Sequence, residues 1–221
     1  MSHTETHDAP GEPLSTQSAV LTAVAGATQS FAPLSNICAH LNAFHVDAND
    51  TSRFLETTHF CAHLNEDVRQ CLLYDSDAKD AKLIGIEYMI SERLFKDLDP
   101  EEKGYWHSHV FEVKSGMLVM PRPAGIPESV WDKAEQKEME KTMRLYGKIF
   151  HLWQVDKGHK LPLGPPNLMS SFTSRDQFDF EKYVGERDRK LGEDWRRKAA
   201  LRQSLEELEI DPHADACWKT K

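Results

Sequence analysis

The spacing of apolar residues changes between helical and strand-like periods along this chain, and it predicts a series of short elements. Over residues 35–45, Ile37, Leu41 and Phe44 recur at helical spacing after a serine that can cap a helix. This pattern predicts a short helix at the start of the folded region.

The next apolar segment predicts a β-hairpin. Residues 58–64 and 68–74 both carry aromatic and aliphatic side chains, and the turn-type residues 65–67 separate them. A single helix over residues 54–74 is the alternative that the pattern leaves open.

The remaining pattern predicts strands and helices without a regular alternation of the two. We expect strands at 83–90 and 149–155, a second hairpin formed by 107–113 and 117–120, and helices at 91–98, at 128–146 and for one turn from residue 99. The βαβα rhythm of a doubly wound fold is absent. We therefore predict an α+β fold, with a small antiparallel sheet built from hairpins, packed by helices, and a long C-terminal helical segment.

The composition divides the chain into three parts. Residues 1–30 are rich in Ser, Thr, Ala, Gly and Pro and cannot bury enough apolar surface to offset the entropy of ordering, so we expect a mostly disordered tail. Residues 31–172 form the single α+β core domain. Residues 173–221 are charge-laced and helical, with an interrupted apolar stripe. This segment covers the core, packs on the partner subunit of a homodimer, or lies on a lipid surface.

The charge and cysteine content exclude several classes of protein. With 27 Lys and Arg against 36 Asp and Glu, the net charge of −9 disfavours nucleic acid and anionic membranes as partners. No apolar run is long enough for a transmembrane segment, and the start of the sequence lacks the features of a secretory signal. Four cysteines without a C-x-x-C pair do not indicate a disulfide framework. We expect a reduced, cytoplasmic protein.

Two pairs of histidines in the predicted core carry the candidate chemistry. His59 and His63 are four residues apart and share one face of either a helix or a strand, and His107 and His109 share one face of a strand. Two such pairs can bring three or four nitrogens to one divalent ion, and His151 is a fifth core histidine. Zinc or iron is the expected metal, because both accept imidazole ligands.

Acidic residues and a cysteine lie near these histidines in the sequence. Glu87 stands inside an apolar strand, where a carboxylate must be paired, protonated or metal-bound, so it is the candidate ligand or general base. Glu112 falls on the opposite face from His109 if that segment is a strand. Cys61 shares the face of His59 and His63; it is a thiolate ligand or, as we expect, a buried and inert cysteine. The pentapeptide CAHLN occurs twice, but the flanking residues differ, so we neither treat it as a repeat nor pair its cysteines.

Several long strings in the sequence resemble the oil-body-associated protein family, a domain of unknown function shared by plants, fungi and bacteria. The strings are PLSNICAHLNAFH, HFCAHLNEDVRQCLLYDS, AKLIGIEYMISERLF, YWHSHVFEVKSGMLVMP, YGKIFHLWQVD and LPLGPPNLM. The family pattern carries histidines at the positions of His40, His45, His59, His63, His107, His109 and His151. It supplies no established catalytic residues. For plant members, the resemblance implies a peripheral role on lipid droplets.

Three hypotheses about function follow. The first is a protein with a divalent-metal site built from His59, His63, His107 and His109, assisted by Glu87, that acts on a small, lipid-derived molecule as a metal-dependent enzyme. The second is a non-enzymatic peripheral protein of lipid droplets. The third is a metal-free enzyme that uses His and Glu in acid-base catalysis. Histidines with a purely structural role are the remaining alternative.

Overall fold

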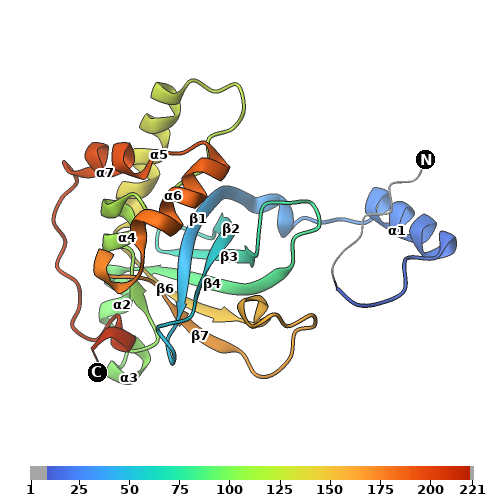
Figure 1. Cartoon of the computed structure of the whole chain (residues 1–221), viewed down its shortest axis with the longest axis horizontal. Helices are drawn as coiled ribbons and strands as arrows, with labels where there is room; N and C mark the ends of the chain where they lie inside the picture. The colour runs from blue at the N-terminus through green and yellow to red at the C-terminus, as the bar shows by residue number, and fades with distance from the viewer. Residues whose placement is uncertain (1–8, 220–221) are drawn as a thin grey trace.

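The computed structural model of the protein describes residues 9–219. Its sheet is a closed antiparallel barrel of six strands (Figure 1). The barrel strands are β1 (Ile37–Asp47), β2 (Phe54–His63), β3 (Val68–Tyr74), β4 (Leu83–Ser91), β6 (Leu145–His151) and β7 (Asn167–Ser170). They pair in the order β4-β3-β2-β1-β7-β6, and β4 also pairs with β6, which closes the sheet. The two-residue strand β5 (His107–Ser108) adds to β6.

The predicted small sheet of hairpins is wrong, because the sheet closes on itself. The predicted hairpin of residues 58–64 and 68–74 is confirmed by the pairing of β2 with β3. The pairings that close the barrel join β4 to β6 and β1 to β7, strands that are far apart in the chain. Long-range pairing of this kind leaves no trace in the local order of apolar and polar residues, so the sequence pattern did not predict closure.

Strand β1 replaces the predicted helix at 35–45. The strand is buried on both faces: Leu41 packs in the barrel core, whereas Phe44 packs outside it in a second core with Trp195. A strand covered on both faces carries apolar residues at nearly every position and lacks the alternation that identifies a half-exposed strand. The helical spacing of its apolar residues was therefore misleading.

The predicted second hairpin is also wrong, because its first arm turns into a helix. After β5 the chain enters helix α4 (Val110–Ser115), which ends at Gly116 in the left-handed conformation with φ of 79°. A Cβ atom at Gly116 would lie 2.3 Å from the carbonyl oxygen of Trp195. Glycine is required there both by the positive φ and by the close approach of another backbone.

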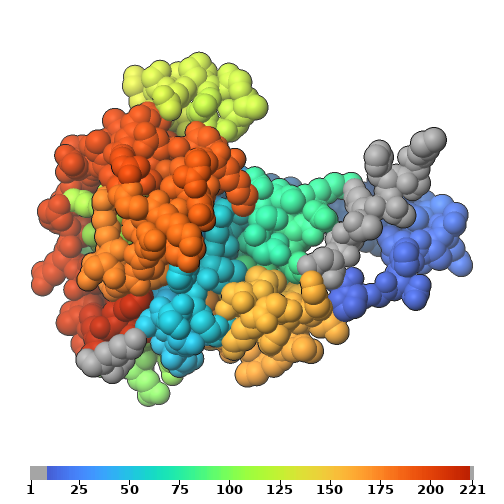
Figure 2. Space-filling view, viewed as in Figure 1, coloured from blue at the N-terminus to red at the C-terminus, as the bar shows by residue number. Residues whose placement is uncertain are grey.

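Short helices cover one side of the barrel. Besides α4 they are α2 (Glu92–Lys96), α3 (Pro100–Lys103), α5 (Glu128–Thr142), α6 (Phe180–Leu191) and α7 (Trp195–Arg202), whereas α1 (Thr16–Thr28) is not part of this cover. The predicted long C-terminal helical segment is instead α6 and α7 followed by a stretch with little regular structure. In Figure 2 this C-terminal part, coloured orange to red, lies over the left side of the molecule, and the cyan and green strand region remains in view beside it. The predicted boundaries at residues 30 and 172 stay a prediction.

Three buried cations fasten α6 and α7 to the barrel, and we call them the cationic anchor: Arg187, Lys198 and Arg202. Arg187 donates hydrogen bonds to Asn42 Oδ1 (3.0 Å) and to the Met117 carbonyl (2.7 Å). Arg202 donates to the carbonyl oxygens of Val113 (2.9 Å) and Leu118 (2.8 Å). Lys198 and Arg202 both form ion pairs with the buried Glu135 of α5.

Helix α1 stands apart from the barrel in Figure 1, and none of its residues is buried. Residues 1–8 of the predicted tail lie outside the described residues. Within the described residues, every helix is too short or too polar to cross a lipid bilayer.

Candidate metal centre

Seven titratable side chains meet inside the barrel, each at most 2% exposed. They are His45 of β1, His59 of β2, Glu87 of β4, His107 of β5, His109 and Glu112 at the start of α4, and His151 of β6. We call this set the His/Glu cluster. Alternate residues of a barrel strand point inward, so each strand delivers one side chain to the same level of the interior.

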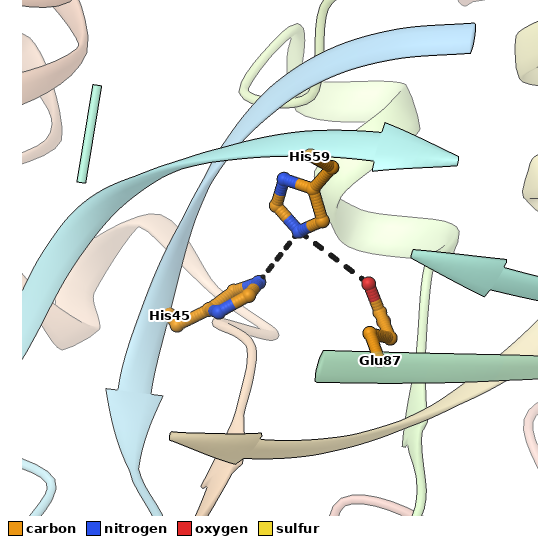
Figure 3. Close-up of side chains that lie close together, drawn as sticks. All are labelled: His45, His59 and Glu87. Atoms are coloured by element: carbon orange, nitrogen blue, oxygen red, sulfur yellow. Dashed lines mark hydrogen bonds and ion pairs between the residues drawn. The ribbon is translucent and has the colours of Figure 1, made fainter. Parts of the chain in front are cut away.

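Glu87 lies at the middle of the His/Glu cluster. Its Oε2 is 3.4 Å from His59 Nε2, and its Oε1 is 3.4 Å from His107 Nε2 and 3.5 Å from His109 Nε2. Figure 3 shows Glu87 and the ring of His45 both approaching the same nitrogen, Nε2, of His59. Neither oxygen of Glu87 has a hydrogen-bond partner among the described residues. A buried carboxylate left in this state is costly unless a cation or a proton accompanies it.

Hydrogen bonds on the far side of two rings determine which nitrogen faces Glu87. His59 Nδ1 donates to the Thr57 carbonyl (3.1 Å), and His109 Nδ1 donates to the Leu145 carbonyl (2.9 Å). In a neutral imidazole the other nitrogen, Nε2, then carries a lone pair. A lone pair directed at a carboxylate that also lacks a hydrogen makes the contact repulsive until a proton or a metal ion lies between the two groups.

A chain of three imidazoles runs from His59 to the barrel wall. His45 Nε2 lies 2.8 Å from His59 Nε2, and His45 Nδ1 lies 2.9 Å from His151 Nε2. A proton can occupy either end of each of these bonds. His45 can therefore present a lone pair to a metal ion while its Nδ1–H is held by His151.

Burial and the neighbouring charges spread the pKa values of the cluster apart. Burial lowers the pKa of His107 to about 3 and, with support from His59, that of His151 to about 4. Burial also opposes charge on His109, but its contacts with Glu87 and Glu112 outweigh burial and raise its pKa to about 9. Burial raises the pKa of Glu112 to about 7. With these pKa values, His109 is the histidine that carries a positive charge beside Glu87 in the metal-free protein. Its Nε2 lies 3.5 Å from Glu87 Oε1, which is a long ion pair rather than a good hydrogen bond.

Gly147 of β6 makes the room that the cluster needs. A Cβ atom at this position would lie 2.3 Å from Glu87 Oε1 and 2.4 Å from His107 Cε1. Both are impossible contacts, so only glycine allows these two side chains to meet. A glycine inside a strand is a known sign of close approach, but the sequence pattern placed Gly147 between a predicted helix at 128–146 and a predicted strand at 149–155, so this signal was not recognised.

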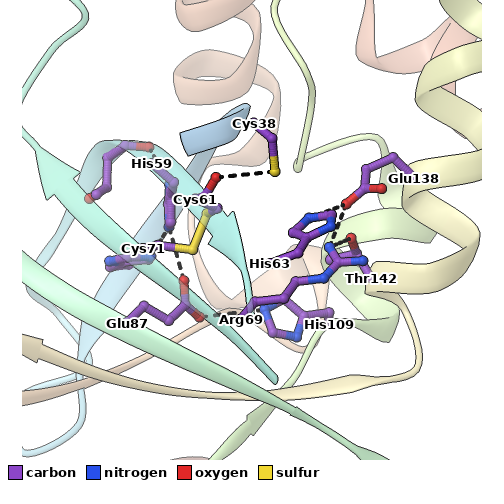
Figure 4. Close-up of a disulfide and its surroundings, with 12 residues drawn as sticks. Cys38, His59, Cys61, His63, Arg69, Cys71, Glu87, His109, Glu138 and Thr142 are labelled. Carbon is purple, nitrogen blue, oxygen red and sulfur yellow. Dashed lines mark hydrogen bonds and ion pairs between the residues drawn. A yellow bond between two sulfur atoms is a disulfide. The ribbon is translucent and has the colours of Figure 1, made fainter. Parts of the chain in front are cut away.

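The structure brings together four of the five predicted site residues, namely His59, Glu87, His107 and His109. His63 is not among them: its Nε2 lies 3.5 Å from Glu138 Oε1 of α5 (Figure 4). His63 does share a strand with His59, but four residues of strand span about 13 Å. Residues four apart on one face are neighbours in a helix, but on a strand they are too far apart to bind the same ion.

Three members of the cluster lie outside the predicted ligand set. Glu112 and His45 were not predicted as ligands, and His151 was predicted only as a fifth core histidine. Glu112 was placed on the opposite face from His109 because that segment was read as a strand. It lies in α4 instead, where residues three apart share a face. His45 is known from the sequence as a histidine of the family pattern, in a segment predicted to be a helix, and it reaches the cluster from β1.

The expectation that Cys61 is unpaired is wrong. Cys61 and Cys71 face each other on β2 and β3 and form a disulfide, with Cα atoms 4.0 Å apart (Figure 4). The disulfide fills the level of the barrel next to His59 and Glu87, and it separates them from His63. Cys38 and Cys217 are free.

The cluster is packed tightly. The space among its side chains is too small for a water molecule. A cavity of about 220 Å³ that Glu87 also lines is formed with Phe60, Ile86 and Tyr88, and the other members of the His/Glu cluster do not line it. A metal ion has a different requirement. With metal–ligand bonds of about 2.0–2.1 Å, ligand atoms in a tetrahedral site are about 3.3–3.4 Å apart. The measured separations around Glu87 are 3.4 and 3.5 Å. The residues present therefore fit a divalent ion.

Comparison with known proteins supplies the family. Residues 31–206 match a family described as a protein of unknown function, DUF1264. Oil body-associated protein 1B of Arabidopsis thaliana is 44% identical over 212 residues, which cover 95% of this chain and 85% of that protein. Oil body-associated protein 1A of Zea mays is 48% identical over 168 residues, covering 76% of this chain and 68% of that protein. No solved structure matches the chain.

These relatives are plant proteins, so the wider occurrence in fungi and bacteria stays a prediction. The matched region contains the whole barrel and the His/Glu cluster. The chain belongs to the DUF1264 family, whose curated relatives are the oil-body-associated proteins.

Proposed function

We propose that this chain is a peripheral protein of oil-body surfaces whose barrel binds a divalent transition-metal ion, zinc or iron. The names of its relatives support the location. One observation carries the metal: the Glu87 carboxylate is 1% exposed, accepts no hydrogen bond among the described residues, and faces the Nε2 atoms of His59, His107 and His109.

Imidazole nitrogen and carboxylate oxygen together form a ligand set that both zinc and iron accept. In addition, the Nδ1–H groups of His59 and His109 are held by backbone carbonyls, which is the usual arrangement of a metal-binding histidine. When bound, the ion would supply the positive charge that Glu87 lacks and could act as a Lewis acid.

The enzymatic hypotheses need more than this. A small-molecule substrate requires a cavity beside the histidines of the cluster, and the packed interior offers none in this conformation. Metal-free acid-base chemistry by Glu87 and His109 requires the same access. We therefore propose metal binding without assigning a reaction.

Metal content tests the proposal directly. Untagged protein, purified without added metal, should carry zinc or iron at close to a stoichiometric amount when measured by inductively coupled plasma mass spectrometry. Glu87→Gln should lose the metal. His63→Gln is the matched control and should retain it, because its imidazole lies outside the cluster beside Glu138. Protein with only traces of any transition metal, and with a melting temperature that zinc and iron leave unchanged, would refute metal binding.

The proposed contact with the oil body is helix α1, not the C-terminal segment. The inner faces of α6 and α7 are buried against the barrel through the cationic anchor and Phe180, Val184 and Trp195. By contrast, Val20, Leu21 and Val24 of α1 are 58%, 61% and 54% exposed. Residues 13–36 contain no charged side chain. An uncharged, apolar helix favours a neutral lipid surface over an anionic one, which would repel a chain of net charge −9.

Flotation with artificial droplets of triolein and phosphatidylcholine tests this contact. The pair Val20→Asp and Val24→Asp places two charges on the apolar stripe of α1 and should abolish flotation. The pair Ser18→Asp and Thr22→Asp adds the same charge to the polar side and should preserve it. If both variants float equally, the contact with the droplet lies outside α1. Wild-type protein that remains in the aqueous phase would refute droplet binding.

A further inference from the structure

We propose that the barrel interior is a two-metal centre in which the Glu87 carboxylate bridges the two ions. The proposal rests on the proposed metal binding and goes beyond it in the number of ions and in their ligands. Two groups of ligand atoms support it: His45, His59 and Glu87 form one, and Glu87, His107 and His109 form the other. Within each group all ligand atoms lie within 4.8 Å of one another.

Glu87 is the one residue that the two groups share, and it presents a different oxygen to each. Oε2 faces His59, whereas Oε1 faces His107 and His109. One ion would need all of these nitrogens around a single point, but the described residues do not bring His59 into one group with His107 and His109. A carboxylate with one oxygen on each of two ions suits this arrangement, and two-metal sites hold their ions about 3.5–4 Å apart.

Glu112 completes the second group. Its Oε2 lies 4.0 Å from His107 Nε2 and 3.9 Å from His109 Nε2. This oxygen is buried and has no hydrogen-bond partner among the described residues. His107, His109, Glu87 and Glu112 therefore provide four ligands, the number that a closed tetrahedral site uses.

The first group has three ligands and a supporting histidine. His45 Nε2 and His59 Nε2 converge to 2.8 Å, and His151 Nε2 lies 2.9 Å from His45 Nδ1, where it can accept that proton and hold the ring. Three protein ligands leave one position of the ion open. The two ions thus differ in role: the ion between His107 and His109 is enclosed, and the ion between His45 and His59 has a free position.

The charges inside the barrel suit two ions. Two divalent ions bring four positive charges. Glu87, Glu112 and the buried Asp215 supply three negative charges, which offset all but one of them. Asp215 accepts hydrogen bonds from the backbone nitrogen (2.8 Å) and the hydroxyl (2.9 Å) of Ser108, the residue between the two histidines. It adopts a φ of 57°, and it is the one non-glycine residue with positive φ in the described chain.

Manganese is the probe that tests the proposal, because two bridged Mn²⁺ ions give an exchange-coupled electron paramagnetic resonance signal. Full-length protein is stripped with a chelator, loaded with Mn²⁺, desalted and assayed for metal per chain. We expect two equivalents with a coupled signal. His45→Ala should retain about one equivalent and lose the coupling. His63→Ala is the control and should keep both, because it removes an imidazole outside the cluster.

Glu112→Gln provides a second variant at the other ion, in case His45→Ala does not fold. It should also reduce the content to about one equivalent and abolish the coupling. One equivalent in the wild type would overturn the two-metal centre and leave the proposed metal binding intact, whereas none would overturn both. Two equivalents without coupling, or two that persist in both variants, would place the second ion elsewhere and also overturn the proposal.

Discussion

Two regions of this molecule bury charged side chains to the same extent, but they differ in whether those charges are compensated. The cationic anchor and its partner Glu135 are 1–2% exposed, as is the His/Glu cluster. In the anchor, Glu135 pairs with Lys198 and Arg202, and the carbonyl oxygens of Val113 and Leu118 accept hydrogen bonds from Arg202 Nη1. In the His/Glu cluster, the oxygens of Glu87 face the Nε2 atoms of His59, His107 and His109 at 3.4–3.5 Å and accept no hydrogen bond in the described chain.

The difference separates a structural network from a binding site. A buried charge with good partners costs little once it is paired, and its removal leaves the partner exposed to the full desolvation penalty. A buried charge without partners is costly in the folded protein itself, and a ligand of opposite charge can recover that cost. The anchor should therefore govern stability, and the cluster should govern metal binding.

The largest effect is expected from breaking the anchor. Glu135→Ala leaves Arg202 buried without the carboxylate it pairs with, whereas Lys198 keeps Asp132 and Glu193, and the change should lower the free energy of unfolding by about 3–5 kcal/mol. The folded fraction should bind as much metal as the wild type. Urea denaturation measures the loss. Glu181→Ala removes the partner of Arg196 in an exposed pair and is the control, with an expected change below about 1 kcal/mol. Equal effects of the two substitutions would contradict the distinction between anchor and surface.

The next largest effect is expected at Gly147. In Gly147→Ala the new methyl group collides with Glu87 and His107, which should cost about 1–3 kcal/mol and displace the metal. Gly185→Ala is the matched control in the interior of α6, where the nearest atom is the end of a flexible arginine at 3.7 Å. It should stabilise the protein by about 0.5–1 kcal/mol and leave metal content unchanged. Thermal unfolding and metal analysis give both readouts. Gly147→Ala protein with full metal content would refute the proposed position of the ion.

Part of the cluster could be predicted from the sequence because it depends on local rules. Glu87 stands out as a carboxylate in an apolar strand, and His107 and His109 are close whatever the segment becomes. His63 shows where such rules fail, since a shared face places two residues at one ion on a helix but about 13 Å apart on a strand. Whether this segment forms a helix or a strand therefore decides whether His63 can bind the same ion as His59.

The closure of the barrel could not be predicted from the same patterns. It depends on pairings between β4 and β6 and between β1 and β7, which are set by the packing of the whole domain. Closure is also what brings His45 and His151 to Glu87. The burial of β1 on both faces removed the alternation that would have identified it, so the segment that carries His45 was read as a helix.

A smaller effect on stability is expected from Glu87→Gln, and it sharpens the comparison with Glu135. The amide keeps the shape of the side chain and can donate a hydrogen bond to an imidazole nitrogen, so the stability of the metal-free protein should change by about 1 kcal/mol or less. The rise in melting temperature on adding zinc should disappear. Differential scanning calorimetry with and without zinc tests both statements. A loss as large as that of Glu135→Ala would show that Glu87 is a structural charge.

The smallest expected effect is a pH dependence that distinguishes the two regions in the metal-free protein. The groups that face His109 are Glu87, Glu112, His107 and Asp215. Burial opposes a charge on the ring, but Glu87 and Glu112 outweigh it and raise the pKa of His109 from 6.5 to about 9. A raised pKa favours folding while the ring is charged in the folded state. This contribution is fully present below pH 6.5 and is lost as the pH rises through 9. The unfolding free energy of the chelator-treated protein should therefore fall between these values.

Zinc binding and the cationic anchor both provide controls for this dependence of the unfolding free energy on pH. An ion must displace the proton of His109, so the stabilisation that zinc provides should increase over the same pH range in which the metal-free protein weakens. The pKa of Lys198 is raised above 10.5 despite its burial, chiefly by Glu135, so the anchor stays charged and should add no slope. Urea titrations of wild type and Glu87→Gln between pH 6 and 9 decide the origin. If Glu87→Gln retains the full slope of the wild type, the titrating group lies outside the His/Glu cluster.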